Sequence, residues 1–215
     1  GWRIDISSWP NLAIHGGSTQ VGGGEGGYYT REQYADMVQY AAERYVTIIP
    51  EIDMPGHTNA ALASYPELNI SRVSPALYTG LMVGFSTLDT KSETTYKFVD
   101  DVFRELSELT PGPYLHIGGD ESHVTKLEDY IPFINRVQDI VIAHDKLVIG
   151  WDEIALATLK PNTVVQYWAR ADNAIKGVNQ GAKVLMSPAK YSYPDMKYDS
   201  TSIFGLNWAG YIEAD

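Results

Sequence analysis

The chain has 215 residues, no cysteine and a formal net charge of −11, because 27 acidic residues outnumber 16 basic ones. This acidity argues against partners that need a basic surface, so we expect no nucleic acid and no membrane among them. Without cysteine, the chain forms neither a disulfide nor a thiolate metal site. Hydrophobic residues are 44% and aromatic residues 12% of the sequence, which is typical of a globular protein. No apolar run is long enough for a transmembrane helix.

Three segments have the residue spacing of amphipathic helices, and a capping-box pattern precedes each. An apolar stripe at helical spacing follows each pair of capping residues. We expect Pro132 to interrupt the third helix or to start its main part afresh. The capping pairs are Thr30 with Gln33, Thr90 with Glu93, and Thr125 with Glu128.

Five short β-rich runs lie between and after these helices, which indicates βα units and a parallel sheet. Residues 169–182 are compatible with a further helix, and residues 16–27 and 188–200 are expected to be loops. The acids and tryptophans at the strand ends should converge, because the carboxyl ends of parallel strands share one rim. A doubly wound sheet and a (β/α)8 barrel both allow this, and the repeated acids favour the barrel. The runs are residues 46–53, 114–120, 146–152, 163–168 and 183–187.

The segment 116–121, with the sequence HIGGDE, carries the sharpest chemical signal. A strand that ends here would bring the carboxyls of Asp120 and Glu121 to the rim. Two adjacent acids disfavour double ionisation, which raises the pKa of one of them. Cleavage of a glycosidic bond needs such a neutral acid beside an ionised one. An equally good interpretation is that both acids simply stabilise the N-terminus of a helix.

This segment and several others resemble family-20 glycoside hydrolases, the β-N-acetylhexosaminidases, and bacterial secreted members in particular. The resemblance covers essentially the whole chain and implies an α/β fold, an incomplete (β/α)8 TIM barrel. About five of its eight strands are expected, similar to the family's third to seventh. They would form one partial catalytic domain over residues 1–215, with no second domain and an extracellular location. The matching motifs are GWRI at 1–4, EIDMPGHT at 51–58, HIGGDE at 116–121, GWDE at 150–153, VQYW at 165–168, YPDMKY at 193–198 and residues 205–211.

The resemblance implies an exo-acting enzyme that removes terminal GlcNAc or GalNAc from glycans or chitin oligosaccharides. The reaction is retaining and substrate-assisted: the 2-acetamido oxygen attacks the anomeric carbon and forms an oxazolinium intermediate. By position, Glu121 is the general acid and then the general base. Asp120 orients the acetamido group and stabilises its developing positive charge, and Tyr193 hydrogen-bonds its oxygen. No cofactor is implied.

The same resemblance assigns four residues to substrate binding. Trp151 and Trp168 wall the pocket for the acetamido methyl group, Trp208 lines the sugar site, and Asp195 accepts hydrogen bonds from sugar hydroxyls. Aromatic rings also suit the C–H faces of sugars, although any one tryptophan is more often a core residue.

His57 follows Asp53 in a Pro-Gly turn, and the resemblance places both in a supporting network near the acid. With Glu51 they have the residue types of a metal site. The intervening Pro55 and Gly56 and the lack of a second histidine make that signal weak, so no metal is expected. His116 is expected to be structural.

A complete barrel of this type needs about 250 residues. The family's first, second and last strands, with their sugar-binding arginine, network aspartate, tryptophan and glutamate, are expected to lie outside this sequence. We favour a fragment of a longer gene product over a proteolytic piece or a barrel completed by another chain. Open sheet edges would then favour self-association.

Two other functions stay open. One is a catalytically incomplete remnant that only binds glycans, through Trp151, Trp168 and Trp208. The other is a chitinase-like enzyme, against which the adjacency of Asp120 and Glu121 argues, because that family spaces its acids by one residue.

Overall fold

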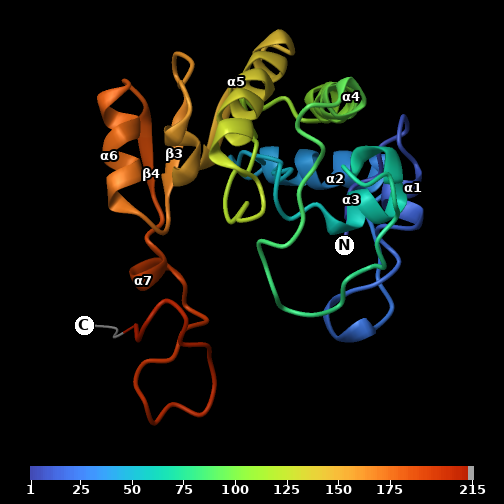
Figure 1. Ribbon diagram of the computed structural model, residues 1–215. Helices are drawn as coiled ribbons and strands as arrows, with labels where there is room; N and C mark the ends of the chain where they lie inside the picture. The colour runs from blue at the N-terminus through green and yellow to red at the C-terminus, as the bar shows by residue number, and fades with distance from the viewer. Residues whose placement is uncertain (213–215) are drawn as a thin grey trace.

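Four parallel strands form the sheet of the computed structural model, which describes residues 1–212 (Figure 1). They lie in chain order across the sheet, so a crossover connects each strand to its neighbour. This α/β arrangement agrees with the predicted βα units. The strands are β1 (Tyr114–His116), β2 (Leu147–Trp151), β3 (Val164–Tyr167) and β4 (Lys183–Met186).

The first predicted strand, residues 46–53, is not a strand in the structure. Only Glu51 forms a bridge, which is parallel to His116 of β1. The amide of Ile52 donates to the His116 carbonyl at 3.0 Å, and the His116 amide donates to the Pro50 carbonyl at 3.0 Å. Prolines lack the N–H that a longer ladder needs, and Pro50 and Pro55 flank this bridge. The segment nevertheless lies beside β1, where a strand was predicted.

Helices cover the sheet between the strands. Helix α5 packs on β2, and α6 packs on β3 and β4. Helix α4 packs against α5 on one side and α2 on the other, and Figure 1 shows this succession across the upper part of the molecule. Large apolar side chains of α4 and α5, among them Phe98, Phe103 and Phe133, are fully buried. These helices are α2 (Arg31–Ala42), α4 (Glu93–Leu109), α5 (Leu127–Ala143) and α6 (Ala171–Asn179).

One of the three predicted capping boxes forms. Gln33 donates its amide to the Thr30 hydroxyl at 3.2 Å, and the Thr30 amide donates to the Gln33 side chain at 3.0 Å. The other two predictions are wrong, because α4 and α5 begin after Ser92 and Lys126, and neither residue makes a side-chain cap.

The expected interruption at Pro132 is also wrong, because α5 runs continuously through this proline. Its neighbours Tyr130, Phe133 and Ile134 are all buried in the core. Helices in proteins draw most of their stability from such packing. Burial of this face therefore offsets the hydrogen bond that the proline removes.

Short helices and loops complete the described chain. Residues 16–27 form a loop with one short 3-10 helix, and residues 188–200 form a loop that begins with α7, as Figure 1 shows below β4. No helix in residues 1–212 combines the length and apolar character needed to cross a bilayer. These elements are α1 (Asn11–Ile14), η1 (Val21–Gly23), α3 (Asn59–Ser64), η2 (Pro66–Leu68), η3 (Asp152–Leu156) and α7 (Ala189–Ser192).

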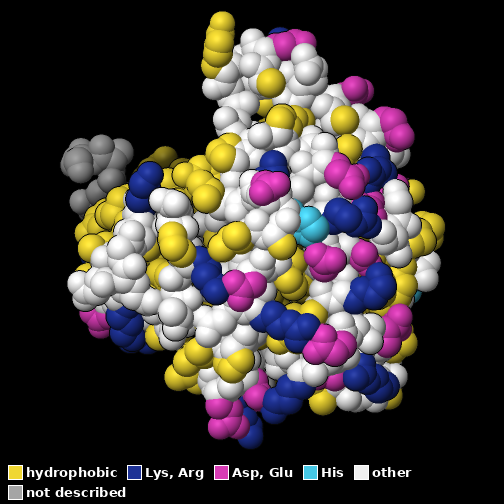
Figure 2. Space-filling view, turned by 90° about the horizontal axis from the view of Figure 1, so that it is seen from above, with side chains coloured by type: hydrophobic (Ala, Val, Ile, Leu, Met, Phe, Trp, Pro, Cys, Tyr) yellow, Lys and Arg dark blue, Asp and Glu magenta, His cyan; other side chains and the backbone are white. Residues whose placement is uncertain are grey.

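Charged side chains of both signs share the outer surface. Arg136 of α5 pairs with Glu93 of α4, with Nη1 and Oε1 2.7 Å apart, and Lys97 pairs with Asp101 at 2.6 Å. Figure 2 shows acidic and basic side chains interspersed on the face seen from above. The charges on this face are thus mixed rather than collected into a patch of one sign.

Candidate functional site

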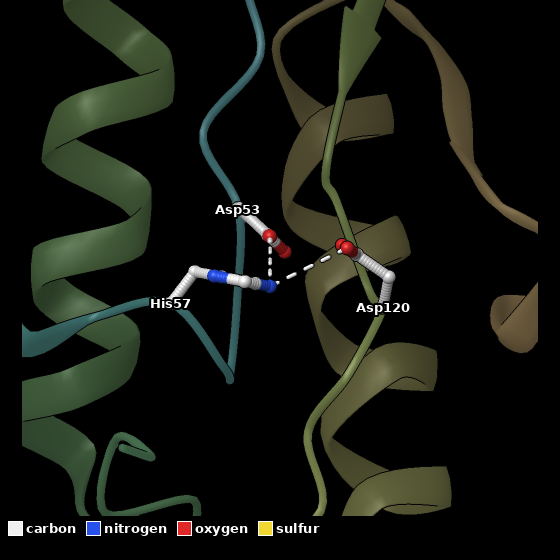
Figure 3. Close-up of side chains that lie close together, drawn as sticks. All are labelled: Asp53, His57 and Asp120. Carbon is white, nitrogen blue, oxygen red and sulfur yellow. Dashed lines mark ion pairs between the residues drawn. The ribbon is translucent and has the colours of Figure 1, made fainter. Parts of the chain in front are cut away.

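Four of the predicted site residues meet where β1 and the segment beside it end. Asp53 and His57 come from that segment, and Asp120 and Glu121 come from the turn after β1. The Nε2 atom of His57 lies 3.1 Å from Oε2 of Glu121 and 3.4 Å from Oδ2 of Asp120. Its distance to Oδ2 of Asp53 is 3.8 Å. Figure 3 shows Asp53 and Asp120 both directed at this nitrogen. One imidazole ring therefore contacts three carboxyl groups.

Two glycines turn the chain between β1 and the acids. Gly118 has a φ of 67° and Gly119 a φ of 106°, which L side chains rarely adopt. The Gly119 amide donates to Oδ1 of Asp53 at 2.9 Å. A Cβ on Gly118 would lie 1.8 Å from the same oxygen, and one on Gly119 would lie 2.5 Å from Ile154. Thus β1 ends at His116 rather than at residue 120 as predicted, because the close approach of Asp53 needs these glycines.

The side chains of Asp53, Asp120 and His57 differ in the direction in which their pKa values are shifted. Burial, followed by the nearby charge of Asp120, raises the pKa of Asp53 well above its usual range. Burial would also raise the pKa of Asp120, but hydrogen bonds with His57 and Asp53 outweigh it and lower that pKa. The pKa of His57 is raised, mainly by its hydrogen bond with Asp120. The structure therefore favours a neutral Asp53, an ionised Asp120 and a protonated His57.

This distribution corrects one expectation. The sequence suggested that adjacency to its neighbour would raise the pKa of either Asp120 or Glu121. The pKa of Asp120 is lowered instead, and the raised pKa beside it belongs to Asp53, which faces Asp120 from another segment. Spatial proximity, which the chain order does not reveal, decides which acid holds the proton.

Asp120 also has an oxygen available for a ligand. Its side chain is 14% exposed, and its Oδ1 atom is buried with no hydrogen-bond partner among residues 1–212. Buried polar atoms are nearly always hydrogen-bonded in native proteins. An ionised oxygen of this kind is suited to accept an N–H or O–H group from a bound molecule.

Asp53, His57 and Asp120 could also be considered as metal ligands, because they offer ligand atoms within 4.8 Å of one another. The contacts of His57 Nε2 with the three carboxyl groups also describe the cluster as an ion-pair network.

Aromatic rings form a continuous series beside these acids. The ring centroids of Trp151 and Trp168 lie 6.1 Å apart, and those of Trp168 and Trp208 lie 6.2 Å apart. Tyr193 meets Trp208 at 5.3 Å, and all three contacts are edge-to-face. The series crosses the ends of β2 and β3 and the segment after β4, so the structure brings together the aromatic residues predicted for the sugar pocket.

Two of these indoles donate hydrogen bonds to carboxylates, and the sequence did not predict these acceptors. Trp151 donates its indole N–H to Oε1 of Glu51 at 2.8 Å, and Trp168 donates to Oε2 of Glu153 at 3.1 Å. Both glutamates lie in the quoted motifs EIDMPGHT and GWDE, but nothing in the spacing shows that they meet an indole. The signal available was their position at strand ends, next to the residues singled out.

Asp152 fixes the backbone that carries Trp168. It is fully buried, and its Oδ2 accepts the amides of Trp168, Ala169 and Arg170 at 3.1, 2.9 and 3.0 Å. Its Oδ1 accepts the side-chain amide of Asn173 at 3.0 Å. A carboxylate with four donors is strongly stabilised, so the end of β3 and the start of α6 are held firmly.

Tyr193 and Asp195, both after β4, differ in their exposure to solvent. Tyr193 is partly buried, and its pKa is raised first by burial and then by the charge of Asp120. Asp195 is exposed, and its charge also raises the pKa of Tyr193. The role of Asp195 toward sugar hydroxyls stays a prediction.

His116 has the environment of a structural residue. It is 4% exposed, its Nδ1 accepts the Gly118 amide at 3.1 Å, and its ring meets Trp151 edge-on at 5.2 Å. Burial lowers its pKa, which favours the neutral ring. It therefore supports the glycine turn and the first ring of the aromatic series.

Comparison with known proteins agrees with this geometry. The family model for the catalytic domain of glycosyl hydrolase family 20 matches residues 1–214. A β-N-acetylhexosaminidase of Cellulomonas fimi is 44% identical over 99% of this chain, and a β-hexosaminidase of Porphyromonas gingivalis is 35% identical over 87%. The chain covers 44% of the first protein and 27% of the second, so it spans less than half the length of these relatives.

Solved structures show the same relationship. The family-20 β-N-acetylhexosaminidase from Streptomyces coelicolor A3(2) superposes with a TM-score of 0.96 at 52% identity. A mutant Streptomyces plicatus β-hexosaminidase in complex with its product, GlcNAc, superposes with a TM-score of 0.95 at 51% identity. Each comparison covers 99% of this chain and 44% of the solved one. The chain belongs to glycosyl hydrolase family 20, whose catalytic-domain model it matches over residues 1–214.

Proposed function

We propose that this chain carries the catalytic centre of an exo-β-N-acetylhexosaminidase, which releases terminal GlcNAc or GalNAc by a retaining, substrate-assisted reaction. The observation that carries the proposal is the state of Asp120. Its pKa is lowered, its charge is held by His57 and Asp53, and its Oδ1 atom has no partner within residues 1–212. This is the arrangement needed beside a group that becomes positively charged during the reaction.

In the first step, the acetamido oxygen of the substrate attacks the anomeric carbon while the glycosidic bond breaks. Glu121 gives its proton to the leaving oxygen. Asp120 accepts the acetamido N–H and stabilises the positive charge of the oxazolinium ring, and Tyr193 donates its hydroxyl proton in a hydrogen bond to the acetamido oxygen. His57, 3.1 Å from Glu121, orients the carboxyl group.

In the second step, the Glu121 carboxylate takes a proton from water, and the resulting oxygen attacks the anomeric carbon. The carbon–oxygen bond to the acetamido group breaks, which restores the N-acetyl group. Two inversions at the same carbon give net retention. Trp151, Trp168 and Trp208 surround the sugar and its acetamido methyl group, with Asp195 accepting from hydroxyls.

The test compares two chromogenic substrates that differ at one position. Nitrophenyl β-N-acetylglucosaminide should be hydrolysed, while nitrophenyl β-glucoside, which lacks the acetamido nucleophile, should not. Asp120→Asn should slow the first reaction about 10²–10³-fold, as loss of a preorganised electrostatic group does. Equal rates on both substrates would contradict the substrate-assisted reaction.

A second candidate is glycan binding without turnover. It is favoured by the aromatic series, whose last tryptophan, Trp208, is 54% exposed and does not depend on the acids. Calorimetry with N-acetylglucosamine separates the two: heat of binding without nitrophenol release from the chromogenic substrate supports the binding function.

A further inference from the structure

The two acids that follow β2 both contact Trp168, through different atoms. Asp152 accepts the backbone amide of Trp168 at 3.1 Å, and Glu153 accepts its indole N–H at 3.1 Å. The backbone and the ring are therefore held separately. Asp152 alone leaves the ring free to rotate about its side-chain bonds, so the hydrogen bond from the indole to Glu153 is the polar contact that selects one orientation.

Glu153 itself sits on a well-anchored element. Its neighbours Ile154 and Ala155 in η3 are buried at 0% and 3% exposure. Ile154 lies so close to the turn after β1 that a Cβ on Gly119 would be 2.5 Å from it. The acceptor that Glu153 presents to Trp168 is thus fixed by the core and by the turn that carries the catalytic acids.

The orientation of Trp168 matters because its ring is in the middle of the aromatic series. It contacts Trp151 on one side at 6.1 Å and Trp208 on the other at 6.2 Å. Any rotation of this ring changes both contacts. Edge-to-face pairs contribute about 0.5–1.5 kcal/mol each beyond burial, so the hydrogen bond and the two ring contacts stabilise the same orientation.

We propose that Glu153 is a positioning residue, which fixes the indole plane of Trp168 and thereby sets the width of the aromatic pocket between Trp151 and Trp208. The consequence for sugar binding rests on the proposed function. The position of the ring does not, and it can be measured without substrate.

The titration of Glu153 makes its hydrogen bond with Trp168 measurable by spectroscopy. Burial, followed by the charge of Asp152, raises its pKa to about 7, with Asp120 adding to the shift. After burial, the charge of Glu153 also contributes to the raised pKa of Tyr130 of α5, whose hydroxyl donates to the Gly119 carbonyl at 2.7 Å. A carboxylate accepts hydrogen bonds more strongly than a carboxylic acid, so the indole bond should tighten as the pH rises through this value.

The experiment records the indole N–H resonances of the 215-residue chain in ¹⁵N-labelled protein across this pH range. The chain has five tryptophans, and loss of one signal in Trp168→Phe assigns the relevant one. The Trp168 resonance should move downfield with a midpoint near pH 7. In Glu153→Gln this resonance should not move with pH, because the glutamine side chain keeps an oxygen that accepts the indole N–H but has no carboxyl group to titrate. Glu153→Leu should shift it toward the position of an indole in water.

Two controls make the result specific. Trp9 donates its indole to Asp101 at 3.0 Å, so Asp101→Asn should move the Trp9 signal and leave Trp168 unchanged. The pKa of His57 is also raised, by its hydrogen bond with Asp120, but a shift that His57 causes would persist in Glu153→Gln. Unmoved signals of Trp2 and Trp9, which pack on Phe98 outside the aromatic series, establish that each Glu153 variant is folded.

A Trp168 resonance that titrates equally in wild type and Glu153→Gln would overturn the proposal, and so would one unchanged in Glu153→Leu. If Glu153→Leu does not fold, the Gln variant decides. If the Trp168 resonance behaves as expected but the chain does not bind N-acetylglucosamine, the proposed function is refuted. The positioning role of Glu153 would then still stand.

Discussion

Asp53 and Asp120 face each other from neighbouring segments, and the proton of the pair belongs to Asp53 while the charge belongs to Asp120. Two buried carboxyls in one site cannot both ionise cheaply. The 3.4 Å approach of His57 to Asp120 decides which one does. The residue that stays ionised is thus the one proposed to stabilise the developing cation.

The first prediction separates these two aspartates. Asp53→Asn resembles the protonated acid, keeps an oxygen for the Gly119 amide and leaves the charge of Asp120 in place. It should therefore retain activity within about tenfold, whereas Asp120→Asn loses about 10²–10³-fold. Steady-state hydrolysis of nitrophenyl β-N-acetylglucosaminide measures both. A larger loss in Asp53→Asn than in Asp120→Asn would show that the charge is on the other residue.

The glycine turn should tolerate no side chain at position 118. Gly118→Ala places a Cβ 1.8 Å from Asp53 Oδ1, so Asp53 has to move and activity should be lost. Gly181→Ala is the matched control, since its φ is also positive, at 86°, and its Cβ meets no atom within 4 Å. Both variants carry about 1–2 kcal/mol of backbone strain. Equal effects of the two on activity and on urea unfolding would contradict the close approach.

Glu105 of α4 should be important for stability. Its side chain is 3% exposed, pairs with Arg31 and accepts the amides of Ser7 and Ser8 at 2.8 and 2.9 Å. Glu105→Ala leaves these donors unpaired, so unfolding in urea should show a loss of about 3–5 kcal/mol. Glu108→Ala, at a position 54% exposed, should change stability by less than about 0.5 kcal/mol. Similar losses in both would rule out this role.

Stability should also depend on pH through Glu153. Its pKa is raised by burial and by Asp152 from 4.5 to about 7, so the folded state prefers the protonated carboxyl. The contribution of protonated Glu153 to the free energy of unfolding is fully present below pH 4.5 and is lost as the pH rises through 7. Glu153→Gln removes the titration. Thermal unfolding should therefore show the variant gaining Tm relative to wild type above pH 7, and a difference that is constant with pH would contradict this.

Several structural features were predictable because local patterns determine them. The strand ends at Trp151 and near residue 167 follow from hydrophobic runs bounded by polar residues. The Thr30 box formed because α2 begins directly after Thr30, which places Gln33 at the third helical position. The meeting of aromatic and acidic side chains also followed from the common rim of parallel strands.

Other features depend on contacts that no local pattern encodes. Residues 46–53 have the composition of a strand, yet prolines limit them to one bridge. Pro132 was expected to disrupt a helix that tertiary packing keeps intact. The sharing of a proton between Asp53 and Asp120, and the carboxylates of Glu51 and Glu153 on the two indoles, depend on side-chain directions across segments far apart in the chain.

The most direct test of the catalytic account is the release of nitrophenol from nitrophenyl β-N-acetylglucosaminide by wild type and Glu121→Gln. Glu128→Gln, on the exposed start of α5, is the matched control. We expect nitrophenol release by wild type and by the control, and a rate loss of about 10²–10⁴-fold in Glu121→Gln, the usual contribution of a general acid–base. Wild-type turnover in Glu121→Gln would contradict it.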